Sequence, residues 1–208
     1  MRKCFDANRF SSLSRWMFGW ILALLVWGTT ADAARYTTVI IDAGHGGKDK
    51  GAYWGGIRES HLTLATAQRL ERLLKKKGMK TVMTRRSDVF VSLASRAAIA
   101  NRYRNSVFVS IHYNAHRNTR FRGVETYCWG ATGMKLAGAI QRRLPSRLGT
   151  RNRGVKRRQL TVLMKTKMPA VLVECGFLSN PTERGRCRGA SYQQTVAQAI
   201  CDGIMVVR

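Results

Sequence analysis

Acidic residues are scarce in this sequence: 11 Asp and Glu stand against 37 Lys and Arg, which gives a formal charge of +26 and an isoelectric point near 11.3. Proline is scarce too, and three prolines in 208 residues exclude a proline-rich disordered protein. No apolar run reaches about 18 residues, so a protein with several membrane spans is excluded. Hydrophobic residues make up 45%, enough for a core. The sequence therefore predicts one small, strongly basic, compact domain.

Residues 1–33 have the pattern of a secretory signal peptide. Basic residues precede an apolar run at residues 17–28, and Ala31 and Ala33 place small side chains at the expected cleavage positions. An uncleaved anchor or a buried core helix is the alternative for this run. We expect export, with the periplasm as the destination, and a folded domain formed by residues 34–208.

Few cysteines remain in that domain, namely Cys128, Cys175, Cys187 and Cys201. In an oxidising compartment four cysteines allow three pairings, and the sequence does not choose among them. The spacing of Cys187 and Cys201 makes that pair conceivable. The disulfide state therefore stays open at this stage.

Three apolar, β-branched runs each lead into a chemically distinctive residue. They are residues 39–41 before His45, residues 107–111 before His112, and residues 171–173 before Glu174. Near-continuous apolar runs are typical of strands that are covered on both faces.

Segments with helical spacing alternate with these strands. The predicted helices cover residues 62–74, 92–104, 134–148 (interrupted by Pro145) and 182–207, and shorter strands are predicted at 81–84, 123–129 and 160–165. Composition does not change after residue 33, so one domain is expected. The pattern predicts the α/β class: a single domain with a mostly parallel, twisted sheet of about six strands and helices on both faces.

The strand ends carry the residues that suggest chemistry. In an open α/β sheet the carboxyl ends of the strands border the crevice where ligands bind, so His45, His112 and Glu174 are expected to converge. Glu59, in a glycine-rich loop before the first long helix, is a fourth candidate. A lone histidine or glutamate at such a place is often only structural, and Glu174 has the alternative role of a buried partner for a basic group.

Two imidazoles, one carboxylate and an open position form a common catalytic zinc set. We therefore predict one zinc ion held by His45, Glu59 and His112. A further carboxylate beside such a site can take a proton from water and deliver it to a leaving amine, which is the role predicted for Glu174.

Six sequence blocks occur in an order that is found in a known family. They are GHGGKDKGA (44–52), Glu59 with LTLATA (62–67), TRRSD (84–88), Leu93 with Arg96 and residues 100–101, SIHYNA (110–115), and ECGFLSN (174–180). In these blocks the chain resembles the zinc-dependent N-acetylmuramoyl-L-alanine amidases of bacteria, the cell-wall amidases with a type 3 catalytic domain. The resemblance extends over about residues 37–205.

The resemblance implies hydrolysis of the amide between N-acetylmuramic acid and the L-alanine of peptidoglycan stem peptides, in wall remodelling or daughter-cell separation. It implies zinc ligation by His45, Glu59 and His112, and catalysis by Glu174. The interval from His112 to Glu174 has no room for a long autoinhibitory helix, so we expect control from outside the domain, for example by a protein activator.

Other polar residues near these blocks are weaker candidates. Asn114 and Arg85 are predicted to contact substrate, with bracing of a turn as the alternative for Asn114 and an ion pair with Asp88 as the alternative for Arg85. His61 and His116 are left out of the predicted metal site. Cys175 suggests a cysteine nucleophile, but neighbours on a strand point to opposite faces, so a thiol beside Glu174 is expected to face away.

The excess of positive charge has two functional interpretations. Phosphate neutralisation would favour a nucleic-acid binder, but no recognition motif is present, so we expect no nucleic-acid partner. We favour electrostatic attraction to an anionic cell envelope, with peptidoglycan as the partner and a monomer as the expected state. The competing function is a non-catalytic, basic peptidoglycan-binding protein on the same fold.

Overall fold

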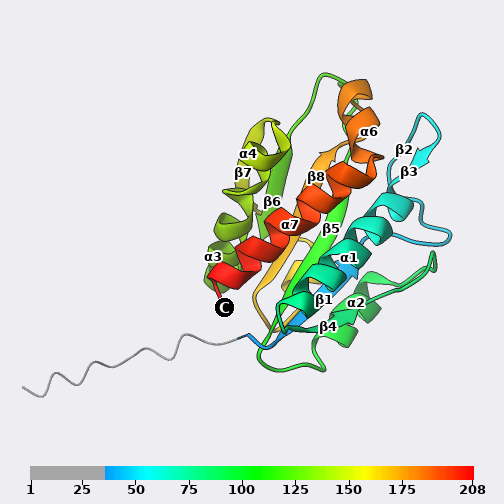
Figure 1. Cartoon of the computed structure of the whole chain (residues 1–208). Helices are drawn as coiled ribbons and strands as arrows, with labels where there is room; N and C mark the ends of the chain where they lie inside the picture. Colours follow the sequence, from blue (N-terminus) through cyan, green and yellow to red (C-terminus); the bar gives the residue numbers. More distant parts are fainter. Residues whose placement is uncertain (1–35) are drawn as a thin grey trace, which may run out of the picture. The chain divides into compact units, whose positions relative to one another are not determined.

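A six-stranded sheet organises the domain in this computed structural model, which describes residues 36–208 (Figure 1). The signal peptide predicted at residues 1–33 lies outside the described residues. In spatial order the strands are β4 (Lys80–Met83), β1 (Thr38–Ala43), β5 (Ser106–Asn114), β8 (Ala170–Phe177), β6 (Val124–Cys128) and β7 (Asn152–Arg157). A small hairpin, β2 (Tyr53–Trp54) with β3 (Ile57–Arg58), stands apart from this sheet.

Most neighbouring strands are parallel, as predicted. β1 pairs in parallel with β4 and β5, β5 with β8, and β6 with β7, while β6 runs antiparallel to β8. The carboxyl ends of β1, β5 and β8 therefore meet at one edge of the sheet, and this edge positions the site.

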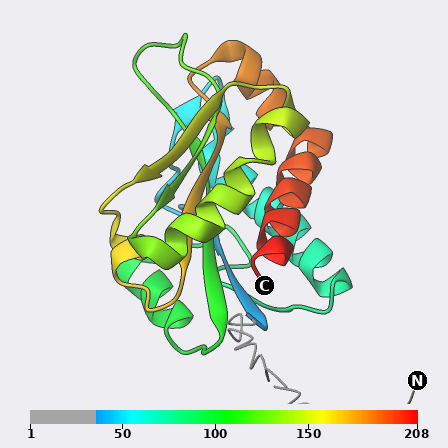
Figure 2. The same ribbon diagram turned by 90° about the vertical axis from the view of Figure 1, so that its left-hand side faces the viewer.

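Helices cover both faces, which explains the unbroken apolar runs of the central strands. One face packs against α1 (Glu59–Lys76), α3 (Gly130–Gln141) and α7 (Ala190–Val206), and the other against the short α2 (Leu93–Ala100) and α5 (Thr161–Met164). Figure 2 shows the sheet between α7 on one side and α2 with α5 on the other. The α/β prediction is therefore confirmed.

Alternation along each strand divides the residues between these faces. Ile41 and Val109 face the larger core under α1 and α7, whereas Ile40 and Phe108 face the smaller core under α2 and α5. Since side chains alternate in a strand, Asp42, His112 and Glu174 also belong to the α2–α5 side. The two short helices cover less of their face and leave the carboxyl edge of the sheet accessible.

Helix ends follow local chemistry. α1 begins at Glu59, whose negative charge suits the helix N-terminus, and ends with Lys75 and Lys76 before Gly78, which has a φ of +73°. Ser92 caps α2 through its hydroxyl oxygen. α4 (Leu144–Leu148) follows α3 after a break and has Pro145 in its first turn, so the predicted interruption is present. α6 (Pro181–Cys187) precedes α7.

The structure differs from the sequence analysis in two places: one predicted strand is wrong and one strand was not predicted. Residues 160–165 form the helical turn α5 rather than a strand, because Leu163 and Met164 bond back to the Leu160 carbonyl and pack toward α2. The basic segment at 152–157 is the edge strand β7, for which the sequence analysis predicted no strand. Charged residues on an edge strand discourage pairing with other chains, so charge and strand structure are compatible here.

Cysteines form no disulfide in the described part of the chain. Cys128, Cys175, Cys187 and Cys201 are free and buried, so the pair Cys187–Cys201 considered from spacing is not formed. Across residues 36–208, no helix combines the length and the apolar character needed to cross a bilayer.

Candidate metal centre and active site

Three predicted ligands meet at the carboxyl edge of the sheet. His45 follows β1, His112 lies on β5, and Glu59 is the first residue of α1. Glu59 Oε1 lies 2.9 Å from His112 Nδ1 and 3.2 Å from His45 Nε2, and one ligand atom of each residue falls within 4.8 Å of the others. The structure thus brings together the His-Glu-His set that the sequence predicted.

The loop after β1 aims the His45 ring at Glu59. His45 Nδ1 bonds to Asp49 Oδ2 at 2.9 Å, which leaves Nε2 directed to the cluster. His45 has a φ of +60°, a left-handed conformation that is uncommon for residues with a side chain and that recurs at functional sites. A side chain at Gly51, which has a φ of +65°, would collide with both Glu59 and His45. Small residues here let the ligands approach each other.

Glu59 is buried, and its two oxygens are held from several sides. Ala52 N donates to Oε2 at 2.8 Å and Tyr113 N donates to Oε1 at 3.0 Å. Burial by itself raises the pKa of Glu59, but hydrogen bonds from His112 and His45 outweigh burial and hold the pKa far below its usual value. Glu59 is therefore ionised, as a metal ligand must be.

Two buried arginines hold the loop that follows β1 and carries His45. Arg96 bonds to Asp42 Oδ1 at 2.7 Å and to the His45 carbonyl at 2.7 Å. Arg85 donates to the carbonyls of Ala43, Gly44, Ser60 and Ser87 and to Thr63 Oγ1. Arg85 is 3% exposed, so its predicted contact with substrate does not fit this position. The correction has a physical reason: loop carbonyls have no partners in the sheet, and the guanidinium satisfies them.

Glu174 lies on β8 beside the ligands. In the sheet register it is opposite His112 on one side and Glu125 of β6 on the other. Its Oε2 is buried and has no hydrogen-bond partner among residues 36–208. Burial, followed by the charges of Glu59 and Glu125, raises the pKa of Glu174 well above its usual value. A carboxyl group with a free oxygen and a raised pKa is suited to proton transfer.

Glu125, which sequence analysis did not single out, is the centre of a polar network. Its carboxylate accepts from Tyr127 and Asn114, and it forms ion pairs with Lys156 and with Arg153, whose Nε is 3.3 Å away. These contacts outweigh burial and lower the pKa of Glu125. Two carboxyl groups that face each other across β6 and β8 thus have opposite pKa shifts.

Asn114 belongs to the polar network around Glu125. Its Nδ2 donates to Glu125 at 2.8 Å and its Oδ1 accepts from Ala115 N at 2.8 Å. The side chain is partly exposed. The structure thus supports the bracing role that was the alternative for Asn114, and its contact with substrate stays a prediction.

The remaining candidates lie away from the ligands. Cys175 is buried in the larger core on the opposite face of β8, and burial raises the pKa of its thiol well above its usual value. His61 is exposed and lies 3.2 Å from Asp88. His116 stacks on Phe121 with 3.9 Å between ring centroids. None of them belongs to the His-Glu-His cluster.

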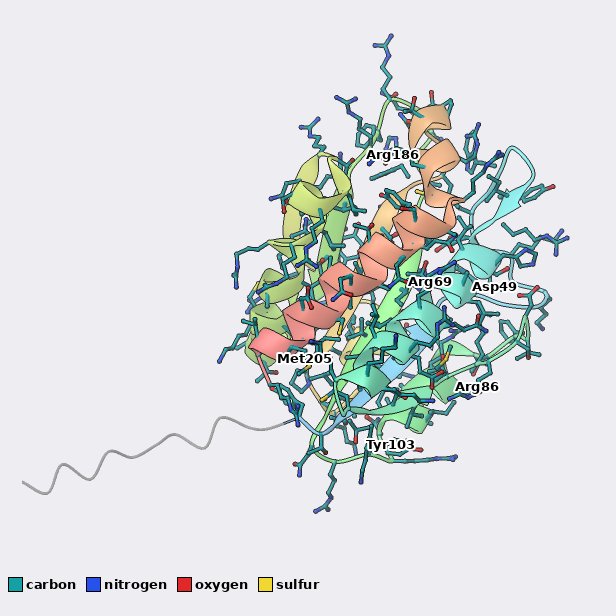
Figure 3. All side chains as sticks on the ribbon, viewed as in Figure 1. Asp49, Arg69, Arg86, Tyr103, Arg186 and Met205 are labelled. Carbon is teal, nitrogen blue, oxygen red and sulfur yellow. The ribbon has the colours of Figure 1, made fainter. Side chains whose placement is uncertain are left out.

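A cavity of about 360 Å³ opens beside the ligands and is reached from the α2–α5 side. His45, His112 and Asp49 form one wall. Apolar side chains form much of the rest, including Phe90, Val91, Leu93, Leu160, Val162 and Leu172. The cluster therefore borders a space large enough for part of a substrate. Figure 3 shows Asp49 at the right-hand margin of the domain and Tyr103 near its lower margin.

Comparison with known proteins agrees with this geometry. The family model described as N-acetylmuramoyl-L-alanine amidase matches residues 39–206. The chain belongs to this amidase family. The N-acetylmuramoyl-L-alanine amidase LytC of Bacillus subtilis is 39% identical over 170 residues, which covers 80% of this chain and 34% of LytC.

Solved structures of amidases share the fold. The catalytic domain of CwlV from Bacillus (Paenibacillus) polymyxa superposes with a TM-score of 0.79 at 36% identity, covering 82% of this chain and 97% of that one. The CwlD amidase of Clostridioides difficile, solved in complex with the GerS lipoprotein, has a TM-score of 0.79 at 32% identity, covering 82% and 98%. The protein is thus an amidase enzyme that acts on peptidoglycan.

Three residues important to the amidase site escaped sequence analysis as site residues. Asp49 orients His45, Arg96 holds the loop, and Glu125 faces Glu174. Arg96 stood in one of the matched blocks, which was a usable signal. The roles of Asp49 and Glu125 depend on a loop fold and on a strand pairing, neither of which has a local sequence pattern.

Proposed function

We propose that the amidase is zinc-dependent and hydrolyses the amide between N-acetylmuramic acid and L-alanine in peptidoglycan. The observation that supports this most is the convergence of His45, Glu59 and His112 beside Glu174, with both histidines lining a cavity. We further propose that the protein works in the periplasm, in wall remodelling or daughter-cell separation.

The donor set fits zinc. Two imidazoles and one carboxylate are ligands that Zn²⁺ accepts, and three protein ligands leave one position open for water or substrate. Asp49 supplies the carboxylate that commonly supports a zinc-bound histidine. Bound zinc would supply Lewis-acid polarisation of the scissile carbonyl and activation of water.

The chain's own residues then move the proton. Glu174 takes a proton from the attacking water and delivers it to the L-alanine nitrogen as the carbon–nitrogen bond breaks. Its orphaned Oε2 is the atom free to do this. The Glu125 carboxylate is already engaged in hydrogen bonds and ion pairs, so Glu174 is the carboxyl group available for proton transfer on this part of the sheet.

Digestion of purified sacculi tests three points together: which bond is cleaved, whether zinc is needed, and whether the protein is an enzyme or only a binder. We expect the protein to release stem peptides that begin with L-alanine, chelation to stop release, and added Zn²⁺ to restore it. Mass analysis of the products identifies the cleaved bond. Binding to sacculi with no release, with or without zinc, would favour the competing non-catalytic binder.

Glu174→Gln tests the proton transfer separately from the metal. We expect amide cleavage to fall by about 10²–10⁴-fold, because a glutamine cannot carry the proton. Metal analysis should still find one zinc per protein, since Glu174 is not a proposed ligand. Glu71→Gln, a change on the far part of α1, is the control and should keep full activity. Retained cleavage in Glu174→Gln would contradict the mechanism.

A protein activator is also proposed. The similar CwlD amidase was solved with the GerS lipoprotein, so a partner on this fold has precedent. Weak cleavage of sacculi by the isolated protein that rises with a periplasmic extract would support activation, and full activity without the extract would argue against it.

A further inference from the structure

Positive charge is concentrated between residues 115 and 188, a range that includes the loop after β5 and the edge strand β7. Between residues 115 and 188 the chain contains only three carboxylates, Glu125, Glu174 and Glu183, among many Lys and Arg. Glu125 and Glu183 are buried, and Glu183 accepts hydrogen bonds from the backbone at Gly123 and Phe177. The exposed charged side chains of this part of the chain are therefore almost all basic.

A cavity of about 180 Å³ lies within this surface, beneath the loop between β5 and β6. Figures 1 and 2 show that loop extending beyond the carboxyl end of the sheet, near α6. Four arginines line the cavity together with Asn118 and Phe121: Arg120, Arg122, Arg151 and Arg153. We call this space the four-arginine cavity.

Three of the four guanidinium groups have no partner within the described residues. Arg120, Arg122 and Arg151 are exposed and make no ion pair and no side-chain hydrogen bond within residues 36–208. Like charges that converge without a counter-charge repel one another, and an anion in the cavity would relieve this repulsion. Guanidinium groups also match carboxylates geometrically.

Arg153 connects the cavity to the catalytic residues. Its guanidinium lies 4.8 Å from the centre of the Phe121 ring and 5.1 Å from that of Phe177, which gives it a fixed position. Its Nε is 3.3 Å from Glu125, the direct cross-strand neighbour of Glu174. Side chains opposite each other on paired strands are about 5 Å apart. A few residues of extended peptide, at about 3.4 Å each, would therefore reach from Glu174 to the four-arginine cavity.

The other side of the site has a different character. The cavity of about 360 Å³ is lined by apolar residues such as Phe90 and Leu160. Its one arginine, Arg96, donates its hydrogen bonds to Asp42 and to loop carbonyls. The proposed substrate is asymmetric in the same way. On one side of the scissile amide is an uncharged amino sugar, and on the other a stem peptide that carries free carboxylates.

We infer that the four-arginine cavity binds stem-peptide carboxylates, and so orients the substrate with its peptide toward β7 and its sugar toward α2 and α5. This inference depends on the proposed function for the identity of the substrate. It adds a specificity-determining site that acts on acidic stems and discriminates against amidated ones.

A pair of soluble muramoyl-peptides tests the inference. The two substrates share the glycan and the stem sequence, and differ only in whether the stem carboxylates are free or amidated. At about 0.1 M salt, which screens diffuse attraction, we expect the wild-type enzyme to favour the free acid by about tenfold or more in kcat/KM. In the triple variant R120Q/R122Q/R151Q this ratio should fall to about one, through a loss of kcat/KM on the free acid.

A matched control removes the same charge elsewhere. Arg72, Arg102 and Arg104 are exposed, lie outside the four-arginine cavity, and make no side-chain ion pair or hydrogen bond in the described region. R72Q/R102Q/R104Q should keep the wild-type ratio. A ratio that falls equally in both triple variants would overturn the inference, because only net charge would then matter.

A binding measurement gives a readout apart from turnover. Calorimetry of the metal-free wild-type protein with a free acidic stem peptide should show binding that is lost in R120Q/R122Q/R151Q and kept in the control. Equal binding by all three proteins overturns the inference. Wild-type cleavage of both substrates at equal rates also overturns it but leaves the proposed function intact, whereas cleavage of neither contradicts the proposed function itself.

Discussion

At the scale of single residues, the position of the predicted ligand His45 is fixed largely by a residue that is not itself a ligand. One ring nitrogen bonds to Asp49 and the other faces Glu59. Its left-handed backbone costs on the order of 1 kcal/mol or more, which the hydrogen bonds of the surrounding loop offset. Asp49 therefore acts as a positioning residue for the metal centre.

Replacing Asp49 by Ala should weaken zinc binding by about 10- to 100-fold, because the His45 ring would lose the partner that selects its free nitrogen. The zinc dissociation constant, measured by competition with a chromogenic chelator, checks this. Asp88→Ala is the matched control, since Asp88 also accepts from one backbone N–H, at Gly47, and from one imidazole, that of His61. Equal losses in both variants would assign the effect to loop stability.

At the scale of elements, α1 combines a functional end and a structural one. Its first residue is Glu59, and its apolar stripe of Leu62, Leu70 and Leu74 buries the helix against the sheet. Farther along, Glu71 pairs with Arg86 and with Lys75, which joins α1 to the segment after β4. Hydrogen bonds from Arg86, only partly opposed by burial and aided by Lys75, lower the pKa of Glu71 from 4.5 to about 2.

Glu71→Gln should therefore destabilise the fold in a pH-dependent way. A carboxyl group whose pKa is lower in the folded state contributes stability above its unfolded pKa, and this contribution is lost as the pH falls from 4.5 toward 2. Arg86 is 61% exposed, so solvent screening limits the contribution to about 1 kcal/mol. Urea unfolding at neutral pH should show a free energy of unfolding that is lower by this amount in Glu71→Gln than in the wild type.

At about pH 3 the difference in unfolding free energy between wild type and Glu71→Gln should be clearly smaller. Below pH 4.5 the Glu71 carboxyl group of the unfolded wild-type chain binds a proton, which favours unfolding. A difference that is independent of pH would mean that the substitution acts through packing rather than through charge.

At the scale of the whole molecule, stability depends on two apolar cores and not on covalent bonds in the described region. The four cysteines at positions 128, 175, 187 and 201 are free, and all four lie at completely covered positions in the larger core. A buried thiol behaves as a small apolar side chain.

Reduction should therefore leave thermal stability unchanged for the protein comprising residues 34–208. A native disulfide contributes about 2–5 kcal/mol, which would move the Tm by several degrees. Scans with and without a thiol reductant, supported by the mass of the alkylated protein, check this. A reductant-induced fall of several degrees would contradict the free-thiol structure.

Much of the architecture was predictable because it follows from periodicity. The runs at residues 39–41, 107–111 and 171–173 are nearly continuous in apolar residues and rich in β-branched ones, a pattern typical of strands covered on both faces. Residues 160–165 show the limit: a segment this short satisfies strand and helix patterns equally, and its packing against α2 decides for the helix.

The sequence by itself determined the chemical types at the strand ends, because His45, His112 and Glu174 each follow an apolar run, and it determined their convergence through the rule for parallel sheets. Only the tertiary structure decided that Arg85 turns inward to satisfy loop carbonyls, that Glu125 faces Glu174, and that four arginines surround one cavity. These features arise from pairing between segments that are distant in the chain. Such contacts depend on the path of loops and on strand order, which local patterns do not encode.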